Sequence, residues 1–267
     1  MQKISQLSAP ALAGVVREKS TLGAIAEMQN SIYDGATMID LHLQCLENTE
    51  EGELKKIIDA ARVPVLALHY PTGKNAPCEE ERVEALLRAV RAGAAGIDMQ
   101  GYTYHLPSKS EFCGEDAYSF TKGDPKEVVT DASVIEKQCA LIEQVHGMGA
   151  EVLLSCHPGI PMRAEQVVEL ALFLEKRGPD VIKIVTMAPN EEDLAESIRA
   201  MLLLKKEIKT PVTYHAGGKH GRLSRIINPL LGGHMAFCVD RYQANSVMEQ
   251  LDLRTAAAVV ENMRKFR

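Results

Sequence analysis

Eight apolar runs alternate with helix-like stretches along the chain, and this alternation is the sequence feature that most restricts its fold. The runs are short and mainly aliphatic, as buried strands are, and they lie at 12–16, 37–43, 64–70, 95–101, 151–157, 180–187, 211–217 and 234–240. Helix-like stretches follow most of these runs, beginning with 21–35 after the first, and the last stretch, 251–266, closes the chain. Eight such repeats in 267 residues predict an α/β fold, a (β/α)8 TIM barrel that spans residues 1–267 as a single domain.

A doubly wound sheet is the alternative architecture, but no glycine-rich dinucleotide loop follows the first run. One connection breaks the rhythm, because residues 101–131 separate the fourth run from its helix. A loop of this length is uncommon without a role, and this one carries five aromatic residues: Tyr102, Tyr104, Phe112, Tyr118 and Phe120. Both a lid or specificity wall over the site and a packed surface excursion or subunit contact fit this composition.

The composition excludes several classes of protein. Hydrophobic residues make up 46% of the chain, and its net charge of −6 argues against a nucleic-acid partner. No apolar run approaches the length that spans a membrane, and the amino-terminal residues lack a signal-peptide core, so we expect a cytoplasmic protein without a membrane partner. The six cysteines are scattered without a CxxC pair, which is typical of thiols in a reducing compartment.

His157 and Lys183 carry the clearest chemical signal. His157 ends the fifth apolar run, and Lys183 interrupts the sixth. Burial disfavours the ammonium form of a lysine, and a neutral amine is a nucleophile that condenses with a ketone to form a Schiff base. A histidine one strand away could then move the proton next to that imine. Consecutive strands of a parallel barrel would direct both side chains into the same mouth.

Polar residues also stand near the carboxyl ends of the neighbouring predicted strands, where barrel cores ordinarily use aliphatic side chains. Strand side chains alternate between two faces, so residues two apart share a face. Several polar residues on consecutive strands converge in this way, and the convergence predicts a site more strongly than any single residue does. They are Asp40, His42, Gln44, His69, Asp98, Gln100, Ser155, Thr213 and His215.

Three segments resemble the type I 3-dehydroquinate dehydratase family: SCHPGI at 155–160, DVIKIVTMAPNEEDL at 180–194 and GGKHGRLSRI at 217–226. The resemblance extends over essentially the whole chain and implies the same barrel fold. It implies that Lys183 forms an imine with a substrate ketone, so that no cofactor is needed. It also implies that His157 removes the adjacent proton and then protonates the departing hydroxyl. Arg225, in the GxxSR motif, is implied to bind the carboxylate of a small keto-acid substrate, which suits a guanidinium group.

The chain departs from the family pattern at other positions. The family's Glu-x-Arg-x-Asp on the second strand becomes 40–44, DLHLQ, and a substrate-facing arginine on the third strand becomes His69. The family glutamate that orients the catalytic histidine becomes Gln100, which leads us to expect a weaker base. The carboxy-terminal lid motif aligns with Gln243 and the residues after it. The predicted substrate-binding residues are therefore Arg225, Asp40, His42, His69, Gln100, His215 and Gln243.

The leading hypothesis is a hydro-lyase that dehydrates 3-dehydroquinate to 3-dehydroshikimate, or a related β-hydroxy-keto acid, through a Schiff base. The replaced residues leave open an enzyme of the same fold that acts on another keto polyol. Asp40, His42, His69, His157 and His215 could instead surround a divalent metal, although no metal is expected beside Lys183. A catalytically inactive ligand-binding descendant is a further alternative, and a homodimer is possible for any of these.

The same replacements predict a pH effect on ligand binding. Unperturbed histidines titrate near pH 6.5, so anion binding that His42 and His69 assist should strengthen as the pH falls through that region. Turnover should respond in the opposite direction, because acid also protonates His157 and removes its function as a base.

Overall fold

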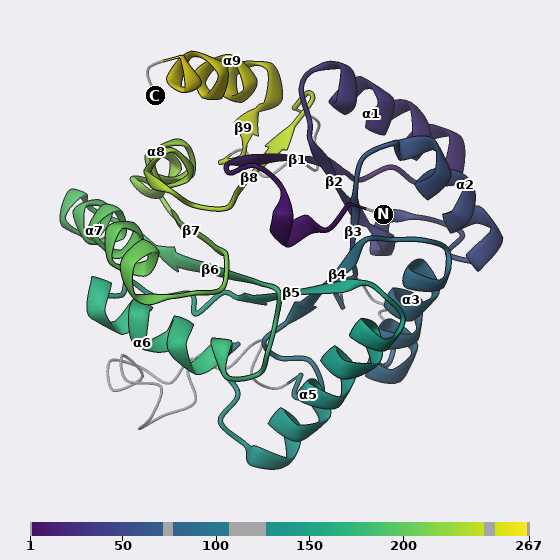
Figure 1. Cartoon of the computed structure of the whole chain (residues 1–267), viewed down its shortest axis with the longest axis horizontal. Helices are drawn as coiled ribbons and strands as arrows, with labels where there is room; N and C mark the ends of the chain where they lie inside the picture. Colours follow the sequence, from purple (N-terminus) through teal and green to yellow (C-terminus); the bar gives the residue numbers. More distant parts are fainter. Residues whose placement is uncertain (1, 72–76, 107–126, 243–248, 266–267) are drawn as a thin grey trace. The chain divides into compact units, whose positions relative to one another are not determined.

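The computed structural model describes residues 2–71, 77–106, 127–242 and 249–265 (Figure 1). Contacts within the chain group it into two units. Unit 1 comprises Met1–Asp98, Val145–Glu151 and Met235–Arg267, and unit 2 comprises Met99–Gln144 and Val152–His234. The assignment of residues 1–267 to a single domain stays a prediction.

All eight predicted strands form within two residues of their expected bounds, and each is followed by a helix. The predicted α/β fold class is therefore confirmed in the order of its elements. The strands are β1 Ala11–Val16, β2 Met38–His42, β3 Val65–Leu68, β4 Gly96–Gln100, β5 Glu151–Cys156, β6 Val181–Met187, β7 Val212–Gly217 and β8 Met235–Val239. The helices are α1 Thr21–Tyr33, α2 Glu51–Ala61, α3 Glu79–Arg91, α5 Ala132–Gly147, α6 Ala164–Glu175, α7 Glu191–Glu207, α8 Ser224–Leu231 and α9 Leu253–Arg264.

In unit 1, β1 pairs in parallel with both β2 and β8, and the ladder continues from β2 to β3 and from β3 to β4. A short strand, β9 (Leu251–Asp252), adds to β8 just before α9, and the sequence pattern did not predict it. Every residue of β1, β2, β3 and β4 is buried. Burial on both faces explains why the parallel strands appear in the sequence as nearly continuous apolar runs.

In unit 2, β6 pairs in parallel with β5 on one side and with β7 on the other. Helices α6 and α7 pack against each other and against β6 and β7, respectively (Figure 1). The Asn190 side chain caps α7 by accepting the backbone amide of Asp193 at 2.9 Å, and Glu191, Glu192 and Asp193 lie in its first turn. Acidic residues there complement the positive end of the helix dipole, which explains why α7 begins at this point.

The long connection after β4 is described only at its two ends. The outgoing end is 101–106 and the returning end is 127–131, and both belong to unit 2. Tyr102 in the outgoing end is fully buried. The predicted lid or specificity wall falls mainly on 107–126, which includes Phe112, Tyr118 and Phe120 and lies outside the described residues.

Candidate active site

Lys183 lies in a row of polar residues across three neighbouring strands of unit 2. In the parallel register, Ser155 of β5 pairs with Lys183 of β6, and Lys183 pairs with Thr213 of β7. The Lys183 side chain is buried, with a residue exposure of 6%. Residues paired in register on adjacent strands share a face of the sheet, so the Lys183 side chain lies between hydroxyl groups and apolar strand neighbours. Such surroundings suit an amine that must react as a nucleophile.

Two histidines lie two residues further toward the carboxyl ends of the same strands, on the same face. His215 follows Thr213 by two residues on β7, and His157 follows the last residue of β5. His215 is buried, whereas the His157 side chain keeps 27% of its surface exposed. Burial holds the pKa of His215 well below its ordinary value, and the positive charges of Arg225, Lys183 and His157 lower it further. Unit 2 thus brings three of the predicted site residues, Lys183, His157 and Arg225, close to a fourth, the neutral His215.

Arg225 lies in the first turn of α8, and the turn before it is held tightly to β7. The Ala216 amide donates to the Ser224 hydroxyl at 2.8 Å, and that hydroxyl donates to the Gly221 carbonyl at 2.6 Å. A Cβ atom on Gly221 would lie 2.6 Å from the backbone of Ala216, so only glycine permits this close approach. The GxxSR motif therefore has a local structural meaning, because its glycine and serine place the arginine beside the strand ends.

Glu127 is the candidate site residue that sequence reasoning missed. Its carboxylate oxygen Oε2 accepts the backbone amide of His157 at 2.8 Å and lies 2.7 Å from Nδ1 of the same histidine. Because a carboxylate can only accept, Nδ1 of a neutral His157 carries the hydrogen and donates it to Glu127. Nε2 is then the basic nitrogen of the ring. The weaker base expected from the replacement of the family glutamate by Gln100 stays a prediction, but the returning end of the long connection supplies His157 with a carboxylate that the sequence did not reveal.

No spacing signal connects Glu127 with His157, which lies 30 residues later in the chain. Gln100, which stands where the family has a glutamate, is fully buried at the end of β4. The next amide, that of Gly101, donates to the Ser155 carbonyl at 2.6 Å, so the end of β4 lies beside β5. A substrate-binding role for Gln100 stays a prediction.

Unit 1 brings together Asp40 and His42 on β2. His42 Nε2 lies 3.2 Å from Asp40 Oδ2, and Gln44 Nε2 donates to His42 Nδ1 at 3.0 Å. Gln44 Oε1 in turn accepts the backbone amide of Tyr70 at 3.2 Å, which fixes the amide orientation. The hydrogen of a neutral His42 therefore lies on Nε2 and faces the carboxylate. Both ring nitrogens are engaged within unit 1, so this histidine is rigidly oriented.

His69 ends up in a less favourable environment for protonation than the sequence suggested. It is buried, and its Nδ1 donates to the Tyr70 carbonyl at 3.2 Å. Desolvation by burial lowers the pKa of His69, and the positive charges of Arg82 and Arg88 lower it further. The hydrogen bond to the Tyr70 carbonyl raises this pKa but does not offset them. The expected strengthening of anion binding near pH 6.5 must shift to lower pH for His69, because the cationic form is disfavoured. Gln243, the remaining predicted binding residue, lies outside the described residues.

Neither thiol chemistry nor a metal centre emerges from the part of the chain that the structure describes. No group of three or more His, Cys, Asp or Glu side chains among those residues is arranged to hold a metal ion. Cys156, next to His157, is fully buried, and burial raises the pKa of its thiol well above the ordinary value. Its Sγ donates to the Glu127 carbonyl at 3.4 Å. Within the same residues, no helix has the length and apolar content that crossing a membrane requires.

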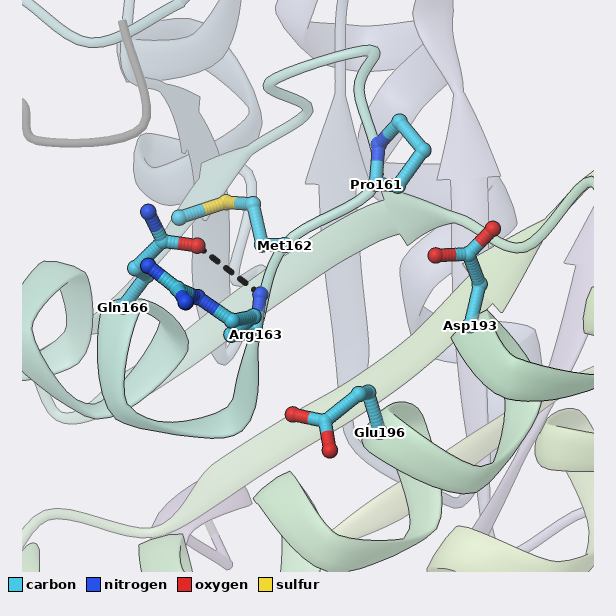
Figure 2. Close-up of a pocket in the computed structure, with 6 residues that line it drawn as sticks. All are labelled: Pro161, Met162, Arg163, Gln166, Asp193 and Glu196. Carbon is cyan, nitrogen blue, oxygen red and sulfur yellow. Dashed lines mark hydrogen bonds between the residues drawn. The ribbon is translucent and has the colours of Figure 1, made fainter. Parts of the chain in front are cut away.

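A separate pocket of about 280 Å³ lies in unit 2, where the chain after β5 meets the starts of α6 and α7 (Figure 2). Two of its polar side chains cap the start of α6: Gln166 Oε1 accepts the Arg163 amide at 2.9 Å, and Glu196 accepts the Ala164 amide at 2.8 Å. The pocket is lined by Pro161, Met162, Arg163, Gln166, Asp193 and Glu196, and it takes no side chain from the row at the strand ends.

The chain is similar to proteins of one known family. A sequence model of the family described as Type I 3-dehydroquinase matches residues 120–266. The 3-dehydroquinate dehydratase of Aromatoleum aromaticum is 24% identical over 262 residues, which cover 95% of this chain and 87% of that protein. The enzyme of the same name from Desulfotalea psychrophila is 25% identical over 207 residues, or 76% of this chain and 77% of that protein.

Solved structures give the same result for the fold. The type I 3-dehydroquinate dehydratase of Clostridium difficile, determined with covalently modified comenic acid, superposes with a TM-score of 0.74 at 16% identity and covers 98% of this chain and 95% of that one. The 3-dehydroquinate dehydratase of Geobacillus kaustophilus also gives a TM-score of 0.74 at 16% identity, covering 98% and 96%. The matched range contains His157, Lys183 and Arg225 as well as Glu127. The chain belongs to the type I 3-dehydroquinase family.

Proposed function

We propose that this protein dehydrates 3-dehydroquinate to 3-dehydroshikimate through a Schiff base on Lys183. The observation that carries the proposal is the placement of Lys183 on β6 and of His157 directly after the paired strand β5, with the Glu127 carboxylate 2.7 Å from His157 Nδ1. A buried amine, an oriented imidazole and an arginine beside them are the groups that this chemistry needs. Family membership supports the same reaction.

The reaction begins when the Lys183 amine adds to the substrate ketone and one water leaves, which forms the imine. His157 Nε2 then takes the proton from the carbon next to the imine, and the electron pair moves into an enamine. The enamine expels the β-hydroxyl group, to which the imidazolium returns the proton, so that a second water leaves. Hydrolysis of the imine consumes one water and releases the product. The net change is the loss of one water, and no cofactor takes part.

Arg225 is proposed to bind the substrate carboxylate through its guanidinium group. His215, held neutral by burial and by the surrounding positive charges, is proposed to donate or accept a hydrogen bond to a substrate hydroxyl without adding charge. Asp40, His42, His69, Gln100 and Gln243 are proposed as further substrate-binding residues. A cytoplasmic location and a homodimer stay predictions.

A related β-hydroxy-keto acid is the second candidate substrate, and one observation favours it. In unit 1, His42 is fixed between Asp40 and Gln44, where the family pattern has an arginine between two acids. An imidazole lacks the permanent charge and the forked donors of a guanidinium group. A substrate with fewer anionic or hydroxyl groups on that side would fit these residues better.

Borohydride trapping with turnover measurements tests the proposal. Reduction in the presence of 3-dehydroquinate should add a stable mass to the peptide that contains Lys183, and ultraviolet absorbance should report formation of the enone product. Lys183→Ala should lose both signals, whereas Lys209→Ala, which alters an exposed lysine, should keep them. An adduct on a different lysine would contradict the assignment. An adduct with other keto polyols, together with none from 3-dehydroquinate, would favour the second candidate.

A further inference from the structure

The returning end of the long connection is pressed against the end of β4 at one point. A Cβ atom on Gly101 would collide with the carbonyl oxygen of Glu127, so the two backbones touch there. The Gly101 amide simultaneously donates to the Ser155 carbonyl of β5. Glu127 itself has a φ angle of 62°, in the left-handed region that residues other than glycine seldom adopt. An uncommon backbone angle persists where its surroundings impose it, and here the contacts of Glu127 supply that constraint.

Three interactions hold Glu127 on the strand end before His157. Its carboxylate accepts the His157 amide and faces Nδ1, and its carbonyl accepts the Cys156 thiol. One carboxylate oxygen thus contacts both the backbone and the ring of the same histidine. This arrangement fixes the ring rotation as well as its tautomer, because the backbone amide anchors the acid independently of the ring.

Gln138 and Arg177 join the two ends of the connection behind Glu127. The Gln138 amide of α5 donates to the carbonyls of Gly101 and Thr103, at 3.0 and 2.7 Å, and so holds the outgoing end. Arg177, just after α6, donates to Gln138 Oε1 at 2.6 Å and to the Val129 carbonyl at 2.7 Å, and so holds the returning end. Both side chains are buried. The Arg177 guanidinium also lies 5.0 Å over the Phe173 ring, which gives a buried cation a favourable contact.

We propose that Glu127 is the positioning residue of His157 and that the Gln138–Arg177 pair sets its place by joining the two ends of the connection. The inference rests on the proposed function, because it assigns His157 the role of base. In this chain the acid that orients the base therefore comes from a loop. The loop ends, α5 and the residue after α6 become part of the machinery that acts through His157.

The first experiment separates charge and tautomer from folding. Glu127→Gln and Glu127→Ala are compared with Glu165→Gln, which changes an exposed acid of α6. Both Glu127 variants should keep the borohydride adduct on Lys183 but lose turnover by about tenfold or more, as partners that orient a functional histidine usually do. The thermal midpoint should fall little in Glu127→Gln, and Glu165→Gln should behave as the unaltered protein. Turnover within twofold of the unaltered protein in both Glu127 variants would overturn the proposal.

A measurement that needs no turnover keeps this test distinct from that of the proposed function. Long-range proton–nitrogen NMR of the ¹⁵N-labelled imidazoles reports which ring nitrogen carries the hydrogen. His157 should hold it on Nδ1 in the unaltered protein and should lose this preference in Glu127→Ala. The same tautomer in both proteins would overturn the positioning role. Failure to form any adduct or product, with the NMR change present, would instead count against the proposed substrate and reaction.

The second experiment tests whether the Gln138–Arg177 pair acts through Glu127. Arg177→Lys removes the fork that reaches both Gln138 and Val129, and Gln138→Ala offers a second route should the lysine variant fold poorly. Arg199→Lys, an exposed substitution on α7, is the matched control. Arg177→Lys and Gln138→Ala should each lower kcat while keeping the Lys183 adduct. Combining either substitution with Glu127→Ala should cause no further loss of kcat. Effects that multiply in the double variant, or a lower thermal midpoint with unchanged kcat, would contradict the proposal.

Discussion

At the scale of single residues, the site shows which roles a sequence can reveal and which it cannot. Lys183 could be predicted because a lysine in an apolar strand conflicts with its surroundings, and the conflict is visible in the letters alone. Glu127 could not, since it lies in a polar stretch where an acid is unremarkable and approaches His157 only through a left-handed backbone angle. The sequence shows that Gln100 replaces the family carboxylate, but it does not show that Glu127 supplies a carboxylate to His157 instead.

His157 provides the prediction that belongs to this scale. His157→Ala should still form the imine, because Lys183 is untouched, but elimination should slow by about 10²–10⁴-fold, the usual contribution of an acid–base group. Stopped-flow absorbance for product and mass spectrometry for the reduced adduct measure the two steps separately. His146→Ala, which removes an exposed histidine on α5, serves as the control. Elimination at a nearly normal rate would remove His157 from the mechanism.

At the scale of elements, the strand positions were predictable and the contacts between loops were not. Burial on both faces makes each parallel strand an apolar run, so β1 to β8 appear in the sequence with nearly correct bounds. The short β9 carries no such run, because both of its residues are only partly buried. The Gln138–Arg177 contacts join backbone carbonyls, and a carbonyl leaves no mark in the sequence of residue types.

The turn between β7 and α8 supports a prediction about binding. Arg225→Ala should weaken binding of a substrate-like carboxylate by roughly 10- to 100-fold, the loss expected for one hydrogen bond to a charged group. Arg222→Ala, which alters an exposed arginine three residues earlier in the same turn, should change binding little. Titration calorimetry on the borohydride-free protein at constant salt measures both. Equal losses in the two variants would mean that the basic turn attracts anions without a specific contact.

At the scale of the whole molecule, the family model matches the carboxy-terminal part of the chain, and the candidate site residues are divided between the matched part and the part before it. The family profile covers 120–266, which holds Lys183, His157 and Arg225, whereas the replaced positions 40–44, His69 and Gln100 all precede it. The residues proposed to handle the ketone and the proton therefore lie within the part of the chain that matches the family. The groups expected to contact the rest of the substrate are those that changed.

Acid sensitivity is the prediction for the molecule as a whole. Burial lowers the pKa of His215 and of His69 in the folded state, while the unfolded chain titrates them near 6.5. As the pH falls below about 6.5, the unfolded state takes up protons that the folded state does not, so stability decreases with acidification by up to about 1.4 kcal/mol per pH unit for each such histidine. Above that pH both states are neutral at these sites, and their contribution is constant.

Urea denaturation at pH 7.5 and pH 5.0 measures this loss. His215→Gln should lose less stability between the two pH values than the unaltered protein does, whatever its absolute stability. His146→Gln, an exposed replacement, should leave the difference unchanged. An identical pH dependence in the His215 variant would show that its imidazole becomes protonated in the folded state as readily as in the unfolded chain.

The contact between Gly101 and Glu127 has a consequence for how such a chain can change over generations. Moving an orienting acid from a strand to a loop frees the strand position, which can then become an amide without loss of the base. If Glu127 orients His157 as proposed, change at two positions is restricted: glycine at 101, where a Cβ atom would collide with the Glu127 carbonyl, and an acid at 127. Descendants of this chain that keep the same arrangement should therefore be recognisable by a glycine and a glutamate at positions 101 and 127.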